Sequence, residues 1–121
     1  MEDQRNLQRI IQESVPGKQC TLAHIIARPN KILYQKLGLN PNIDTQTAGA
    51  IGIMTLTPGE MAIIAGDLAL KASSVEIGFV DRFSGTLIIL GTISQVDSAF
   101  RAVLDYARDV LGFTVTKITK A

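Results

Sequence analysis

Asp81 and Arg82 stand side by side in the stretch FVDRFSG at 79–85, and an acid beside a base is a pairing that acid–base catalysis uses. The stretch separates two apolar runs, which is also typical of a turn between antiparallel strands. Neighbouring residues on a regular strand point to opposite faces, so these two side chains would not act together on one substrate. The loop also lacks a nucleophile with an adjacent base. The residues therefore favour a hairpin turn over a catalytic site.

The chain has one cysteine and one histidine, Cys20 and His24, and their spacing bears on metal binding. In the strand expected at 18–27 the two side chains share one face with Leu22 and Ile26. Four residues of strand separate them by about 13 Å, which is too far for both to bind one ion. We therefore predict no metal site, no cofactor and no intrachain disulfide. Cys20 is expected to behave as a small apolar residue and His24 as a hydrogen-bonded core residue.

Composition excludes several classes of function. The 121 residues suffice for one compact domain, and 46% of them are apolar, so a sizeable core can form. The formal net charge is +1 and no Lys/Arg cluster occurs, which argues against nucleic acid as the main partner. The polar start resembles no secretory signal, and no apolar run reaches the length of a membrane span. No glycine-rich segment has the spacing of a phosphate-binding loop. We expect a soluble protein of the cytoplasm, without a membrane partner.

Apolar periodicity and turn residues define the elements that must position the candidate residues. We predict strands at 7–15, 18–27, 48–57, 74–80 and 86–93, helices at 30–38, 58–72 and 94–112, a loop at 39–47 and a β-prone tail at 113–121. This order indicates an α+β fold, in which one antiparallel sheet carries its helices on one side.

The starts of the two longer helices are expected from their capping residues. Thr57, Pro58 and Glu60 have the spacing of a capping box with proline in the first turn. Ser94 followed by Asp97 has similar spacing before the last helix.

Two elements have surfaces that do not suit a monomer, one too apolar and the other without a clean apolar face. The helix at 58–72 is apolar almost all round, so both of its sides require cover. Neither face of the strand at 7–15 is cleanly apolar, and such a strand is stable only at a sheet edge or paired with another chain. These features indicate assembly rather than catalysis.

Two long strings of the sequence closely resemble bacterial microcompartment shell proteins. They are RIIQESVPGKQCTLAHIIARP and AGAIGIMTLTPGEMAIIAGDLALKASSVEIGFVDRFSGTLIILG, and the match covers roughly residues 9–112. The pattern is similar to the circularly permuted hexameric class of the ethanolamine-utilisation (EutS), propanediol-utilisation (PduU) and choline-utilisation types. The resemblance implies a structural, non-enzymatic protein with an N-terminal barrel strand at 1–17 and a permuted shell domain at 18–121. Gly49 would be a hinge at the permutation junction.

The resemblance also implies where six copies would meet. Lys71, Arg28 and Pro29 would lie at the edge between hexamers. The loop at 81–85 would surround the central pore, and its residues are Asp81, Arg82, Phe83, Ser84 and Gly85.

In relatives of this type the N-terminal strands form a six-stranded barrel over the pore, and a barrel this narrow is filled by side chains. The implied barrel residues are Ile10, Ile11, Gln12, Glu13 and Val15. The expected partners are five further copies, other shell proteins and encapsulation peptides of lumen enzymes, within a shell in the bacterial cytoplasm. Two alternatives remain open at this stage: a ring-forming regulator with ligands at subunit junctions, held by Arg82 or Arg28, and an enzyme with a cross-subunit site.

Overall fold

The computed structural model describes residues 17–41 and 49–121. The elements in these ranges are β1 (Gln19–Ala27), α2 (Lys31–Lys36), β2 (Gly49–Thr57), α3 (Met61–Ala72), β3 (Glu76–Asp81), β4 (Thr86–Thr92), α4 (Ile93–Asp109), β5 (Thr114–Val115) and β6 (Thr119–Lys120). The strand expected at 7–15 and most of the loop expected at 39–47 lie outside the described residues. No described helix is both long enough and apolar enough to span a membrane.

The strands form one sheet in the order β3-β4-β2-β1-β5, and β6 also pairs with β1. The four long strands are antiparallel, as predicted. The two short C-terminal strands instead run parallel to β1, so the sheet is mixed. The end of the chain covers the outer edge of β1, because Ala121 N donates to Ile25 O at 3.1 Å and Ala27 N donates to Ala121 O at 2.9 Å. The α+β class is confirmed.

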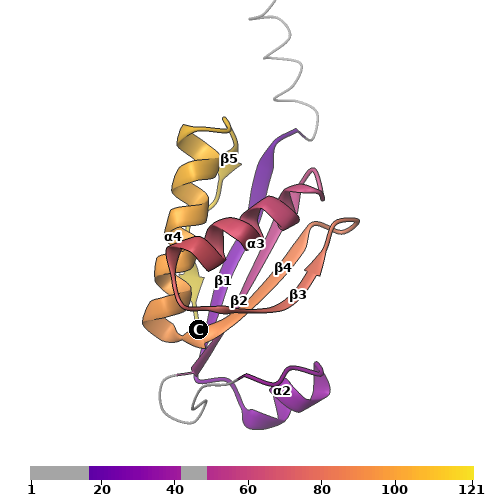
Figure 1. Ribbon diagram of the computed structural model, residues 1–121, viewed down its shortest axis with the longest axis vertical. Helices are drawn as coiled ribbons and strands as arrows, with labels where there is room; N and C mark the ends of the chain where they lie inside the picture. Colours follow the sequence, from indigo (N-terminus) through magenta and orange to yellow (C-terminus); the bar gives the residue numbers. More distant parts are fainter. Residues whose placement is uncertain (1–16, 42–48) are drawn as a thin grey trace, which may run out of the picture.

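Helices α3 and α4 cover one face of the sheet, as predicted, and Figure 1 shows α3 crossing in front of the strands beside α4. The core between them and the sheet includes Phe100, Val96, Val103, Ile25, Met54, Leu87 and Ile89. The prediction that all helices share this side is wrong for α2. Tyr34 of α2 and the following Leu39 are buried against Ile51 and Leu90, which face the opposite side of the sheet.

Both predicted capping boxes of the longer helices are wrong. Helix α3 begins at Met61, and Glu60 at the cap position makes no side-chain cap bond. A turn precedes the helix instead, in which Met61 N donates to Pro58 O at 3.0 Å after a cis Thr57–Pro58 bond.

Helix α4 is capped by Thr92 with Gln95, two residues before the predicted Ser94–Asp97 pair. Thr92 is the last residue of β4, so its backbone is still extended, as a cap residue requires. The side chain of Asp97 is occupied by Arg101 and Lys120. The helix predicted at 94–112 ends earlier, at Asp109, and Gly112 beyond it has a φ of +74°.

Candidate functional site

The loop at 81–85 is the turn of a hairpin, because β3 and β4 pair antiparallel on either side of it. Gly85 N donates to Asp81 O at 2.8 Å and closes the turn. Gly85 has a φ of +74°, a conformation that favours glycine. The prediction of a hairpin turn is confirmed.

The carboxylate of Asp81 is an acceptor within the loop. Its Oδ1 accepts from Phe83 N at 2.9 Å, and its Oδ2 accepts from the Ser84 hydroxyl at 2.8 Å. The hydrogen bond from the Phe83 amide, followed by that from Ser84, lowers the pKa of Asp81. A carboxylate with a lowered pKa, both of whose oxygens accept hydrogen bonds, is a poor general base. The two hydrogen bonds of Asp81 instead stabilise the turn.

The guanidinium group of Arg82 lies over an aromatic ring. Its guanidinium carbon is 5.0 Å from the centroid of Phe83, which is a cation–π distance. The side chain of Phe83 is 83% exposed. The tip of the hairpin therefore presents a guanidinium and a phenyl ring to its surroundings, and an acid–base pair does not form there.

Close backbone packing fixes the position of this loop. Leu56 N donates to Gly85 O at 2.8 Å, which joins the loop to the end of β2. A Cβ added at Gly85 would lie 1.9 Å from Leu56 O, and one added at Gly59 would lie 2.1 Å from Arg82 O. The loop thus rests directly on the turn that precedes α3, and only glycine fits at both contacts.

The residues expected at the hexamer edge lie on different elements. Lys71 is on α3, where its Nζ is 2.7 Å from Asp67 Oδ2, and its side chain is 73% exposed. The hydrogen bond to Asp67 raises the pKa of Lys71, so the ammonium stays charged at neutral pH. Arg28 and Pro29 follow β1, and Arg28 N donates to Gly49 O at 2.8 Å. Gly49 is buried as the first residue of β2.

The predicted common face of Cys20 and His24 is wrong. An irregularity in the β1–β2 register between Cys20 and Leu22 adds one residue to β1 and reverses the alternation. Cys20 therefore faces the core, whereas His24 is half-buried on the opposite face, where its Nδ1 lies 2.6 Å from Thr119 Oγ1. Within residues 17–41 and 49–121, no cluster of three His, Cys, Asp or Glu side chains could hold a metal.

Cys20 is expected to resist thiol reagents in the native protein. Burial raises the pKa of its thiol to about 11, and the thiolate is the reactive form. Native protein at pH 8 should react with Ellman's reagent far more slowly than unfolded protein. The native state also holds this proton more tightly, so the thiol's contribution to stability should fall as the pH rises from about 9 towards 11. Rapid native labelling at pH 8 would contradict this assignment.

An apolar patch on β3 was not expected from the sequence. The β3–β4 register shifts between Ile77 and Phe79, so the regular alternation of side chains along β3 is interrupted there. Phe79 and Val80 are 48% and 44% exposed on the edge strand of the sheet. The glycine between Ile77 and Phe79 was the signal that could have suggested a bulge. An exposed apolar edge strand is typical of a surface that another chain covers.

Comparison with known proteins identifies the class. The BMC domain model matches residues 50–119. Shell protein EutS of Salmonella typhimurium is 54% identical over 116 residues, which cover 96% of this chain and 99% of EutS. The chain therefore belongs to the BMC-domain family of bacterial microcompartment shell proteins. PduU of the same organism is 48% identical over 120 residues and 99% of both chains. A solved "CutR flat hexamer" is 46% identical, covers 99% of this chain and 97% of CutR, and has a TM-score of 0.79.

These findings confirm the resemblance drawn from the sequence and the structural role that it implied. The family is one of shell proteins, so the role of this chain is structural rather than enzymatic.

Proposed function

We propose that this chain is a homohexameric tile of a microcompartment shell, with the loop at 81–85 around the sixfold axis. The observation that carries the proposal is exposed apolar surface on elements that a monomer would leave uncovered. Ile63, Ile64 and Leu70 of α3 are each about half exposed, at 52%, 48% and 50%. Phe79 and Val80 of the β3 edge are exposed to a similar degree, so large apolar side chains are exposed on two elements of the chain. The similar CutR forms a flat hexamer, which supports six as the number of subunits in the ring.

The hexamer has a direct test. Size-exclusion chromatography with light scattering should give about 78 kDa, six times the 13.0 kDa chain, and electron microscopy should show discs or sheets. A stable 13.0 kDa monomer would contradict the proposal.

In such a ring, Arg82 and Phe83 would line the pore. Asp81 would stay ionised beside them, because the hydrogen bonds from the Phe83 amide and the Ser84 hydroxyl lower its pKa and leave its charge in place. The ring would therefore present six guanidinium groups and six phenyl rings, with six carboxylates held in fixed positions within the loops.

The N-terminal segment, with Ile10, Ile11, Gln12, Glu13 and Val15, is proposed to form the barrel over this pore. These residues lie outside the described part of the chain. The placement is supported by where β1 begins. Gln19 pairs with Thr57, and the neighbouring Leu56 bonds to Gly85 of the loop. The chain thus enters β1 at the end of the sheet that carries the hairpin turn, opposite α2 (Figure 1).

Removal of residues 1–16 is expected to increase the permeability of the pore, because the barrel that fills it would be lost. The measurement is single-channel conductance or solute flux through assembled sheets of full-length and truncated protein. Light scattering should first show that the truncated protein is still a hexamer. Equal permeability of the two intact hexamers would rule out the barrel as a plug.

The remaining predictions concern the permutation and the partners. The BMC match begins at residue 50, one residue after Gly49, which supports a junction there between the segment at 18–48 and the rest of the domain. Lys71, Arg28 and Pro29 are proposed to contact neighbouring hexamers and other shell proteins. Encapsulation peptides of lumen enzymes are a further proposed partner, bound as amphipathic helices in a groove.

A further inference from the structure

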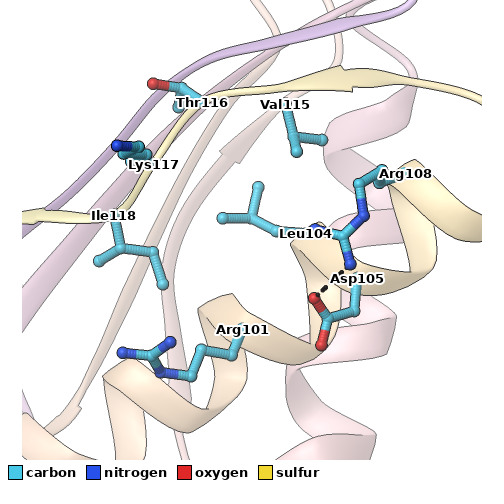
Figure 2. A pocket seen from close by; sticks show the side chains of 8 residues that line it. All are labelled: Arg101, Leu104, Asp105, Arg108, Val115, Thr116, Lys117 and Ile118. Carbon is cyan, nitrogen blue, oxygen red and sulfur yellow. Dashed lines mark hydrogen bonds and ion pairs between the residues drawn. The ribbon is translucent and has the colours of Figure 1, made fainter.

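A groove runs between α4 and the C-terminal segment that joins β5 to β6 (Figure 2). Its volume is about 490 Å³, within the range of roughly 300–1,000 Å³ that is common for small-molecule sites. Leu104 projects into it from the helix, and Val115 and Ile118 project into it from the opposite side. These three side chains form the apolar part of the lining, although Leu104 is itself only 6% exposed.

Two arginines of α4 flank this apolar part of the lining, and their charges are balanced differently. Arg108 lies beside two carboxylates, with its Nη2 3.0 Å from Asp105 Oδ1 and its Nε 2.8 Å from Asp109 Oδ1. Its positive charge is thus more than neutralised. This end of the groove carries a small negative excess.

At the other end Arg101 and Lys120 face Asp97, and Asp105 of the groove lining also attracts Arg101. Arg101 Nε is 2.7 Å from Asp97 Oδ2, and Lys120 Nζ is 3.4 Å from Asp97 Oδ1, so two cations share one carboxylate. Lys117 adds a third positive charge along the groove. The side chain of Arg101 is 66% exposed, and only its Nε takes part in the bond to Asp97. A guanidinium has five N–H groups, which leaves donors for a further carboxylate.

We propose that this groove binds a small amphiphilic carboxylate, with its head group at Arg101 and its alkyl chain on Leu104, Val115 and Ile118. The cations at this end select an anion, and the apolar part of the lining selects a hydrocarbon tail. An anion without a tail would leave the apolar surface unused. The proposal concerns one chain and does not rest on the pore or the hexamer.

Saturation-transfer NMR on the assembled full-length protein tests this inference, with sodium hexanoate as the probe. Hexanoate should receive saturation and bind more tightly than acetate, by roughly fourfold for each methylene that becomes buried. Hexanol, which has the tail without the charge, should bind at least about tenfold more weakly than hexanoate. Equal binding of hexanol and hexanoate would overturn the role of Arg101.

Three variants locate the site. Arg101→Gln should weaken hexanoate binding about tenfold or more, and Arg101→Lys should restore most of it, because the charge returns. Lys36→Gln removes the same charge from α2, outside the groove, and should leave binding unchanged. All three should elute as wild type does.

Unchanged binding in Arg101→Gln, or equal losses in Arg101→Gln and Lys36→Gln, would refute the site. Absence of saturation transfer to hexanoate in wild-type protein would also refute it, including the case in which a neighbouring subunit covers the groove. If the protein did not form a hexamer, light scattering would show it, whereas the groove is tested by binding. The hexamer proposal and the groove proposal can therefore be contradicted separately.

Discussion

Lys71→Ala is expected to leave the hexamer intact and to abolish the assembly of hexamers into sheets. The Lys71 ammonium is exposed at the end of a long apolar stem on α3, and its contact within the chain is the ion pair with Asp67 at 2.7 Å. Exposed pairs of this kind contribute little to the stability of a fold. A large loss of sheet formation would therefore report a contact between hexamers, in which the stem lies on apolar surface and the ammonium donates to a neighbour.

Asp67→Asn is the matched control for this prediction. It removes the same intrahelical ion pair but retains the charge and length of Lys71. Light scattering should show hexamers for both variants, and electron microscopy should show sheets for Asp67→Asn alone. If Lys71→Ala instead dissociates the ring, Lys71 belongs to the interface within the hexamer. If both variants lose sheets, the ion pair itself is required.

The elements with strong periodicity were predictable from the sequence. The apolar run at 48–57 became β2, and the stripe of Val96, Phe100 and Val103 became the buried face of α4. Such patterns follow from burial on one face, which acts on each residue locally.

The errors arose where a neighbouring element decides the local structure. Thr92 caps α4 because β4 ends there, and the position of that end depends on pairing with β2. The irregularity after Cys20 reversed the faces of β1, and no residue type in that stretch marks it. A one-residue change in register moves every later side chain to the other face, so one missed bulge separated Cys20 from His24.

The candidate site was predictable in part. Apolar runs on both sides of Gly85 sufficed to predict the hairpin turn, and strand alternation correctly argued against an acid–base pair. That Asp81 would serve as an acceptor for Phe83 and Ser84 was not visible, because several acceptors could close such a turn. The arrangement of the loop around a sixfold axis rests on family resemblance. The sequence of one chain can indicate that an apolar surface is covered by other chains, but it does not give the symmetry of the oligomer they form.

Gly85→Ala is expected to be the most damaging single-methyl change in the hairpin. Its φ of +74° costs a non-glycine residue about 1–2 kcal/mol. The new Cβ would also lie 1.9 Å from Leu56 O, a backbone atom that cannot rotate away. Relief of that contact requires the loop to separate from β2, with loss of the 2.8 Å bond from Leu56 N to Gly85 O. Both the stability of the chain and the placement of the loop should therefore suffer.

Gly112→Ala separates the cost of the positive φ from the cost of the contact with Leu56 O. Gly112 has the same φ of +74°, but no atom lies within 4 Å of a Cβ added there. Denaturant unfolding at one fixed protein concentration should show a modest loss for Gly112→Ala and a clearly larger one for Gly85→Ala. The difference measures the cost of displacing the loop from Leu56. Permeability should also change in Gly85→Ala hexamers alone, since a Cβ added at Gly112 meets no atom within 4 Å and displaces nothing. Equal losses of stability in the two variants would mean that the loop moves freely, and a rigid ring of Arg82 and Phe83 at the pore would then be untenable.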